Sequence, residues 1–342
     1  MSTNTLFKKA AVFTDIHYGA RQNSYEHNNN CSKFVDWFIK QAHKVEAETC
    51  LFLGDLHHFR SHLNVATMNY ILRDMEKLNN SFEQVFMITG NHDLFYKDKR
   101  DLNSFEFGKL FPKIQIINKI FTKDDVTILP WLVKDEWKKV NKIKSKYVFG
   151  HLELPHFKMN AMIEMPDSGT IQAEHFKSQD YVFSGHFHKR QKRGNIIYIG
   201  NPFPHNFADA WDDERGMMLL EWDKEPEFIN WSDGPKYRTI KLTQLMSDPI
   251  KYIVENTHAR ITIDTEITYE EINFLKEILT SSLKAKEVSF ILEKTEDLQS
   301  DFVGEIEFET VDQIVIKQLQ NIESNTYDKG LLISLYEHLD SE

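Results

Sequence analysis

The first 90 residues alternate between short apolar runs and longer amphipathic segments, and this pattern restricts the fold more than any other feature. Three apolar runs have the length of buried strands: residues 10–14, 49–53 and 85–88. Between them, residues 34–45 and 65–78 carry apolar side chains at helical spacing, and Asn64 stands where a helix N-cap is expected. Strand, helix, strand, helix, strand is the order of a parallel sheet in an α/β protein. We therefore expect an α/β fold.

After residue 93 the strands come closer together and the helices become fewer. Seven further runs are predicted strands: residues 114–117, 126–129, 147–149, 181–184, 196–199, 217–222 and 227–231. A Lys-rich helix is expected at residues 135–144, and residues 155–177 show no clear period and are expected to form a long loop. This spacing predicts a sheet system larger than one βαβ unit.

The turn residues Ser232-Asp233-Gly234-Pro235 mark the expected end of a large domain, residues 1–232. Residues 236–293 are predicted to form a small α/β unit, with strands at 259–264 and 287–292 and a helix between them. Residues 294–307 are acidic and are expected to be a linker. Residues 308–342 carry two short apolar stripes at helical spacing, which predict a C-terminal helix pair.

The composition is that of a folded protein. It also bears on the redox compartment, on membrane insertion and on nucleic-acid binding. Cys31 and Cys50 are too few for a disulfide scaffold and are expected to be buried thiols in a reducing cytoplasm. We find no apolar run of the roughly 18 residues that a membrane-spanning helix needs, and expect no secretory signal at the N-terminus. The net charge of −11 gives no support for nucleic-acid binding but leaves it open, because Lys and Arg still cluster locally. Three candidate basic patches lie at residues 97–100, 138–146 and 189–193.

Five clusters of polar side chains follow predicted strands. They are Asp15-x-His17, Gly54-Asp55, Gly90-Asn91-His92-Asp93, Gly150-His151 and Gly185-His186-x-His188. Ligands of open α/β sheets bind outside the carboxyl ends of the strands, so these clusters are candidates for a site. Their carboxylate, amide and imidazole donors suit Mn²⁺, Fe or Zn²⁺ better than a Cys-rich structural zinc site. Seven donors exceed the needs of one tetrahedral ion and fit two ions about 3.5–4 Å apart that share a carboxylate.

The five clusters, in this order, resemble those of the calcineurin-like metallophosphoesterases. Within that superfamily the chain is similar to SbcD-type nuclease subunits of recombination and double-strand-break repair complexes, especially the versions of large tailed phages. Protein phosphatases of the superfamily carry Gly-Asp-x-Val-Asp-Arg-Gly and Gly-Asn-His-Glu, whereas this chain reads Gly54-Asp55-Leu56-His57-His58 and ends its third motif in Asp93. The resemblance implies a two-sheet sandwich flanked by helices, a small α/β DNA-capping domain and a C-terminal helix pair.

The resemblance also implies a role for each site residue. Two divalent ions, most often Mn²⁺ with Mg²⁺, Fe or Zn²⁺ as alternatives, are expected to share seven ligands. These are Asp15, His17 and His188 for the first ion, Asn91, His151 and His186 for the second, and Asp55 as the bridge.

Four residues beside these ligands are expected to act on the substrate or to support the site. His92 is expected to orient the phosphate or to protonate the leaving 3′ oxygen. Asp93 is expected either to hold the imidazole of His92 or to serve a turn. His58 matches a histidine that contacts substrate phosphate, and His57 stands where the family has an aromatic residue. The sequence leaves open which of these two faces DNA.

The activity implied is a Mn-dependent DNA nuclease, a 3′→5′ exonuclease and single-strand endonuclease. The chain has no Gly-x-x-x-x-Gly-Lys-Ser/Thr loop, so any ATP-driven step would need a partner. The resemblance implies that this partner is an SbcC-type coiled-coil ATPase, bound by the C-terminal helices. The complex would be a heterotetramer that contains a homodimer of this chain. Alternatively, these helices pack on the chain's own small domain. The helix at residues 65–78 is a candidate dimer surface. Host cytoplasm is the expected location for a phage-encoded chain.

Two other functions stay open at this point. One is a small-molecule or cyclic-nucleotide phosphodiesterase or phosphatase on the same fold. The other is a metal-free scaffold that only binds partners, which the complete set of seven donors disfavours.

Overall fold

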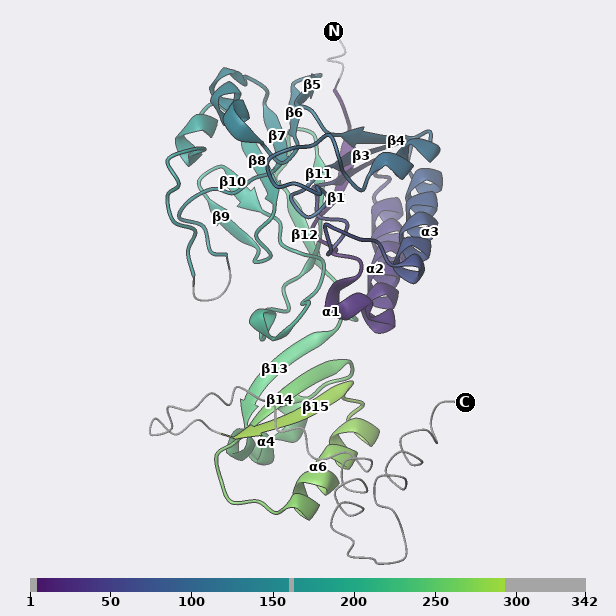
Figure 1. The fold of residues 1–342 in the computed structure, drawn as a ribbon, viewed down its shortest axis with the longest axis vertical. Helices are drawn as coiled ribbons and strands as arrows, with labels where there is room; N and C mark the ends of the chain where they lie inside the picture. The colour runs from purple at the N-terminus through teal and green to yellow at the C-terminus, as the bar shows by residue number, and fades with distance from the viewer. Residues whose placement is uncertain (1–4, 160–162, 293–342) are drawn as a thin grey trace, which may run out of the picture.

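The computed structural model describes residues 5–159 and 163–292, which form two parts (Figure 1). The larger part, here called the main body, comprises the described residues up to 232 and contains two six-stranded sheets. The smaller part, here called the small unit, comprises residues 236–292 and contains a three-stranded sheet. The predicted linker at 294–307 and helix pair at 308–342 lie outside the described residues.

The first sheet has the strand order β12-β11-β1-β2-β3-β4. Its parallel strands are β1 (Lys9–Phe13), β2 (Thr49–Phe52), β3 (Gln84–Ile88) and β4 (Ile114–Ile117). Two antiparallel strands, β11 (Gly216–Glu221) and β12 (Glu227–Asn230), extend the sheet beyond β1. The second sheet has the order β5-β6-β7-β8-β10-β9. Its strands are β5 (Phe121–Lys123), β6 (Val126–Leu129), β7 (Tyr147–His151), β8 (Tyr181–Gly185), β9 (Gln191–Arg193) and β10 (Ile196–Tyr198).

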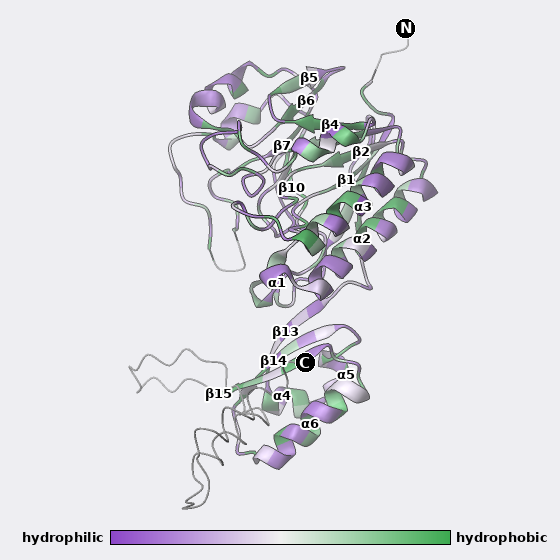
Figure 2. Cartoon of the chain, turned by 45° about the vertical axis from the view of Figure 1, so that its right-hand side comes forward, coloured by the Kyte–Doolittle hydropathy of each residue, from purple (hydrophilic) through white to green (hydrophobic). Residues whose placement is uncertain are grey.

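Strand β1 shows why the two sheets pack into a sandwich. Successive side chains of a strand point to opposite faces. Ala11 and Phe13 pack with helices α2 (Tyr25–Lys44) and α3 (Val65–Ser81). Ala10 and Val12 pack instead against the apolar side chains of the second sheet. Both faces of the strand are therefore buried, and Figure 2 shows the central strands mostly hydrophobic while α2 and α3 carry both kinds of residue. The predicted two-sheet α/β sandwich flanked by helices is confirmed.

The helices differ from their predicted bounds for identifiable reasons. Helix α2 begins at Tyr25 rather than near residue 34, because its first turns bury the polar residues His27, Asn28 and Ser32 and so hide the apolar period. The Lys-rich segment forms a 3₁₀ helix, η2 (Lys134–Lys142), with Val140 buried. Asn64 caps α3 as expected, accepting hydrogen bonds from two backbone N–H groups. The remaining short segments of the main body are α1 (Ala20–Asn23), η1 (Glu106–Leu110), η3 (Ala173–Phe176) and η4 (Phe207–Asp209).

The small unit begins directly after the turn at residues 232–235. Its parallel strands β13 (Lys236–Lys241), β14 (Thr257–Ile263) and β15 (Glu287–Leu292) pack with α4 (Leu242–Ser247), α5 (Pro249–Tyr252) and α6 (Tyr269–Ser281) around a separate apolar core. Strand β13 was not predicted, because its sequence mixes charged and apolar residues. Across the described residues, we find no helix with the length and apolarity required to span a bilayer.

Candidate metal centre

The five polar clusters lie at the carboxyl ends of five strands, three in the first sheet and two in the second. Asp15, Asp55 and Asn91 follow β1, β2 and β3, while His151 ends β7 and His186 follows β8. Because the sheets are packed face to face, these strand ends meet at one edge of the sandwich. The site therefore draws on both sheets.

One group of side chains there consists of Asp15, His17 and His188, here called the first cluster. Their ligand atoms all lie within 4.8 Å of one another. The Nε2 atoms of His17 and His188 are 3.2 Å apart. Asp15 and His17 are fully buried and both have left-handed backbone conformations, with φ of 51° and 50°. Such strained positions in non-glycine residues persist where the surroundings hold them, and they are common at functional sites.

The second group consists of Asn91, His151 and His186, here called the second cluster. The amide oxygen of Asn91 lies 3.0 Å from Nε2 of His151 and 3.0 Å from Nδ1 of His186. Asp55 stands between the clusters, with Oδ2 3.6 Å from Nε2 of His17 and 3.4 Å from Nε2 of His151. The structure thus brings all seven predicted ligands together and gives Asp55 the central place.

This donor set fits divalent cations. Asp15 and Asp55 are 0% and 2% exposed. Asp55 lies within ion-pair distance of the imidazoles of His17 and His151, and Asp15 accepts the backbone N–H of His186. Buried carboxylates need compensating positive charge. Two glycines make the close packing possible. A Cβ atom at Gly54, whose φ is 104°, would lie 2.5 Å from Nδ1 of His151, and one at Gly90 would collide with Asp55.

Burial controls the protonation of the ligands. It raises the pKa of Asp15 to about 7, with the nearby charge of Asp55 adding to the effect. It lowers the pKa of His188 to about 4 and moves that of His186 downward, so these imidazoles are neutral ligands at pH 7. Burial also opposes charging of His151, but Asp55 and Asp15 outweigh it and raise the pKa of His151 to about 9.

Metal binding is therefore expected to release protons. A ligating imidazole must be neutral, and His151 is mostly protonated at pH 7.5 because its pKa is about 9. Binding of Mn²⁺ at pH 7.5 should release about one proton, and the apparent affinity should rise up to about tenfold per pH unit until about pH 9. Calorimetric titration in two buffers of different ionisation enthalpy measures this release. Equal binding heats in both buffers would contradict it, and the exposed His156→Ala variant should behave like the parent.

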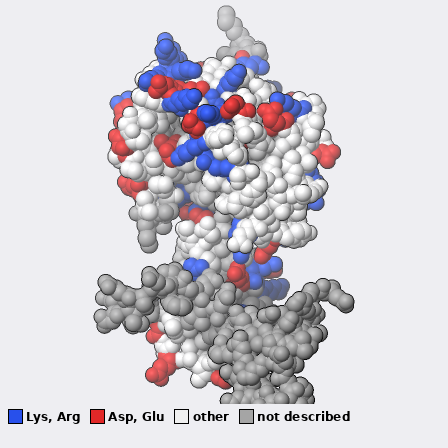
Figure 3. Space-filling view, in the orientation of Figure 1, with Lys and Arg blue, Asp and Glu red and all other residues white. Residues whose placement is uncertain are grey.

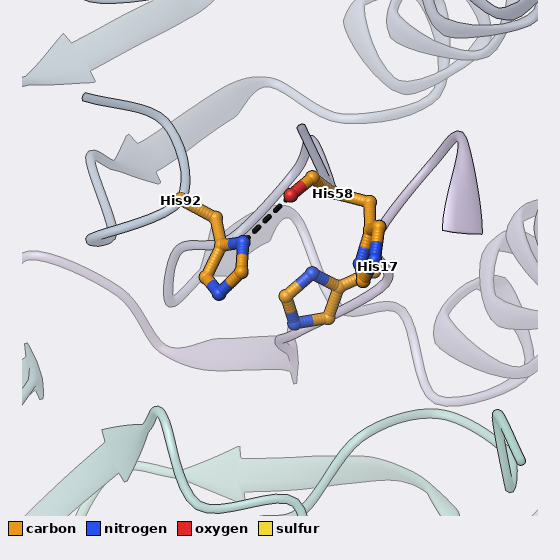
Figure 4. Close-up of side chains that lie close together, drawn as sticks. All are labelled: His17, His58 and His92. Atoms are coloured by element: carbon orange, nitrogen blue, oxygen red, sulfur yellow. Dashed lines mark hydrogen bonds between the residues drawn. The ribbon is translucent and has the colours of Figure 1, made fainter. Parts of the chain in front are cut away.

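Asp93 organises the backbone beneath the site. Its Oδ2 accepts hydrogen bonds from the N–H groups of Gly90 and Asp55, both at 2.9 Å. Its Oδ1 accepts from the N–H groups of Leu56 at 2.9 Å and His57 at 3.1 Å. The ring of His92 instead faces the carbonyl of His58 (Figure 4). Of the two roles expected for Asp93, the geometry supports the turn, and the expected contact with the His92 imidazole is wrong.

Replacing Asp93 with asparagine should destabilise the fold strongly. The amide group would direct N–H donors at backbone N–H groups that now bond to a carboxylate. We expect the free energy of unfolding to fall by roughly 3–5 kcal/mol, since buried charge-assisted hydrogen bonds are lost. Urea denaturation measures the change, and Asp98→Asn, at an exposed position nearby, is the control. A variant as stable as the parent would show that the carboxylate is dispensable.

His57 and His58 point in different directions. His57 is 1% exposed, with Nδ1 2.7 Å from the hydroxyl of Ser104 and its ring against Phe105 and Phe107. His57 is therefore not placed to contact a substrate, and that expectation is corrected. The imidazole of His57 packs between aromatic side chains, as expected at a position where the resemblance places an aromatic residue.

His58 is half-buried, and its ring lies beside those of His17 and His92 (Figure 4). Its ring is 5.5 Å from that of His17 and 5.8 Å from that of His92. The ring of His92 lies 4.8 Å from His17. The three imidazoles have ligand atoms within 4.8 Å of one another, so a phosphate at the first cluster would meet both His58 and His92.

Several residues of the site were missed from the sequence. His205 is 4% exposed, and its ring lies 5.5–5.6 Å from those of His188 and His17. Glu153 lies 3.3 Å from Nε2 of His186, and Trp131 packs against the same ring. His27 contacts the carbonyl of His17 through Nε2 at 3.0 Å. Only Glu153, two residues after His151, stands beside one of the sequence motifs.

Comparison with known protein families assigns the chain to a family. Residues 8–190 match the model of the calcineurin-like phosphoesterase family, more than half of the chain. The chain therefore belongs to this family of metal-dependent phosphoesterases. It is also 26% identical over 201 residues to "Exonuclease subunit 1" of Enterobacteria phage T4. That match covers 56% of this chain and 58% of the phage protein, so the chain spans less than two thirds of that relative.

Solved structures with detectable similarity include the Pseudomonas putida nuclease MPE, with a TM-score of 0.30 and 18% identity, covering 55% of this chain and 66% of that one. A dimetal phosphatase from Danio rerio matches with a TM-score of 0.39 and 11% identity, covering 67% of this chain and 100% of that one.

Proposed function

We propose that this protein is a Mn-dependent DNA nuclease subunit, a 3′→5′ exonuclease and single-strand endonuclease that hydrolyses phosphodiesters by a two-metal mechanism. The observation that carries the proposal is the position of Asp55 between two clusters of oxygen and imidazole donors at the strand ends. A carboxylate in that position can bind two close dications at once.

The seven ligands divide between two ions. Asp15, His17 and His188 would hold one, Asn91, His151 and His186 the other, and Asp55 both. When bound, such ions polarise the phosphate and lower the pKa of the attacking water towards about 7. The donors combine carboxylate, amide and imidazole without thiolate, which suits Mn²⁺, Fe or Zn²⁺, and we propose Mn²⁺ among these on the resemblance to SbcD-type nucleases. Elemental analysis of the purified protein distinguishes it from Mg²⁺, Fe and Zn²⁺.

His92 is placed to move a proton. Its Nδ1 lies 2.7 Å from the carbonyl oxygen of His58. A carbonyl only accepts hydrogen bonds, so Nδ1 donates and Nε2 is left to exchange a proton with the substrate. The backbone N–H of His92 donates to Oδ1 of Asp55 at 2.8 Å, which fixes the ring relative to the ligands. His92 is therefore proposed as the general acid for the leaving 3′ oxygen, and His58 as the phosphate-binding residue.

DNA is proposed as substrate because the phage relative is named as an exonuclease subunit and because cationic side chains flank the second cluster. Lys97 is exposed and lies 3.8 Å from Glu153 and above the ring of Trp131. Arg60 donates to the backbone carbonyl of Asn91. Figure 3 shows Lys and Arg gathered on the upper part of the main body, interspersed with acidic residues. A basic surface beside the site would hold the phosphate backbone.

Partners are proposed on the same basis. The relative is a subunit by name, and we propose an SbcC-type coiled-coil ATPase as partner, bound through residues 308–342, with a homodimer of this chain in a heterotetramer. We propose the small unit as a DNA-capping domain. Co-expression with a candidate ATPase, followed by pull-down, tests this part.

The test of the activity is digestion of end-labelled duplex and single-stranded DNA with Mn²⁺, in parallel with cyclic nucleotides and a chromogenic phosphodiester. Release of nucleotides from DNA 3′ ends supports the proposal. Turnover of the small substrates without DNA cleavage would replace it with a small-molecule phosphodiesterase.

A further inference from the structure

Two of the main-body segments that contact the small unit each lead to a ligand of the first cluster. Residues 19–23 follow His17 and include α1, which lies next to β13 in Figure 1. Residues 207–215 are linked to His188 by the side chain of Arg215, which donates a hydrogen bond to the backbone carbonyl of His188. Nothing in the proposed chemistry explains this arrangement.

The first segment reaches the small unit through Arg21. Its guanidinium donates to the hydroxyl of Tyr237 at 3.2 Å and to Oε2 of Glu287 at 2.8 Å. Tyr237, His258 and Glu287 are register neighbours on β13, β14 and β15, so Arg21 contacts a row that crosses the whole small sheet. The rings of Tyr237 and His258 are stacked at 4.7 Å, and Nδ1 of His258 lies 2.9 Å from Glu287.

The same segment is tied to the backbone of His17. The N–H of Ala20 donates to the carbonyl of His17 at 3.1 Å. Arg21, Gln22 and Asn23 are all in the left-handed region, with φ of 54°, 57° and 63°. Three consecutive residues in this region are strained and need contacts that hold them. The contacts of Arg21 with the small unit are of that kind.

The second segment is centred on Arg215, which is 2% exposed. Its guanidinium donates to the carbonyl of His188 and, at 2.9 Å, to Asp212. Nearby, Trp211 donates its backbone N–H to the carbonyl of Tyr237 and its indole N–H to that of Thr239, both at 3.1 Å, along the edge of β13.

Asp213 completes the second segment by pairing with Arg238 of the small unit at 2.9 Å. The backbone of His188 is thus linked, through Arg215 and its neighbours, to the edge of β13.

The second cluster is supported differently. The carbonyl of Asn91 accepts from Arg60 at 2.8 and 2.6 Å, Nδ1 of His151 lies 2.7 Å from the carbonyl of Leu53, and Nε2 of His186 lies 3.3 Å from Glu153. These partners all belong to the main body. The two clusters therefore differ in whether their supports extend to the small unit.

We propose that the docked small unit selectively positions the first cluster, with Arg21 and Arg215 as positioning residues for His17 and His188. This inference rests on one part of the proposed function, namely that the two clusters bind metal ions. It follows that displacing the small unit, for example by a partner or DNA, would loosen one ion while leaving the other in place. Partners of metal ligands contribute strongly to affinity even though they do not touch the ion.

The test measures Mn²⁺ affinity in two backgrounds that each keep one site. Asn91→Ala leaves the first cluster intact, and His188→Ala leaves the second. Arg21→Ala should weaken Mn²⁺ binding roughly tenfold in the Asn91→Ala background and by less than about twofold in the His188→Ala background. Arg60→Ala, which removes a support of Asn91, should show the opposite preference. Arg21→Lys, which keeps a cation for Glu287, should restore most of the lost affinity.

Equal weakening of both sites by Arg21→Ala, or of neither, would overturn the inference. If Arg21→Ala does not fold, as judged by circular dichroism, Asp213→Ala tests the second segment in the same backgrounds with the same expected result. A parent protein that binds no pair of Mn²⁺ ions would instead reject the proposed function. The two failures are therefore distinguishable.

Discussion

Replacing Asp55 with alanine is expected to abolish DNA cleavage and to weaken both metal sites. Asp55 is the one side chain within ion-pair distance of ligands from each cluster, His17 and His151, among the residues the structure describes. Removing it takes away a shared ligand and the negative charge that holds two dications close together. A bound metal ion supplies several kcal/mol of transition-state stabilisation, so the rate should fall by roughly 10³-fold or more.

Digestion of labelled DNA and calorimetric titration with Mn²⁺ should be run on the same Asp55→Ala preparation. Asp135→Ala, which removes an exposed carboxylate that pairs with Lys138 outside both clusters, is the control and should cleave and bind like the parent. Persistent binding of two ions by Asp55→Ala would remove the central premise of the proposed mechanism.

Replacing His92 with serine should separate chemistry from metal binding. His92 is outside both ligand clusters, yet its ring lies 4.8 Å from that of His17. We expect both ions to bind as in the parent, while the single-turnover rate falls by roughly 10²–10⁴-fold, the range for loss of a general acid or base.

The substrate can be used to test this acid role further. A DNA with a better leaving group at the scissile bond needs less protonation and should recover part of the loss in His92→Ser. The exposed His62→Ser variant controls for removal of an imidazole. Loss of Mn²⁺ from His92→Ser would make His92 a ligand and contradict the assigned role.

Much of the main body could be predicted because its signals are local. The strand at residues 85–88 and the tetrapeptide at residues 90–93, a glycine followed by three polar residues, are neighbours in the sequence. The edge of the sheet at which they lie follows from the order of strands and helices. The cap at Asn64 is equally local. These features need no knowledge of distant contacts.

The rest depends on tertiary packing. His57 and His58 are chemically identical neighbours, and His57 is the buried one because distant residues, Phe105, Phe107 and Ser104, surround its ring. His205 reaches the site from a segment without any motif. Strand β13 exists because β14 and the neighbouring Trp211 complete its hydrogen bonds, which no period in its own sequence indicates.

The loop after β8 carries the last proposed metal ligands of the chain to be made during translation. His186 belongs to one cluster and His188 to the other, so neither can be completed before that loop has left the ribosome. A nascent chain should therefore stay unloaded, and unable to cut nucleic acid, until the strands up to β8, which belong to both sheets, have been made. Metal uptake would then report that strands of the two sheets have packed together, and by mass action it would draw newly made chains towards the folded state.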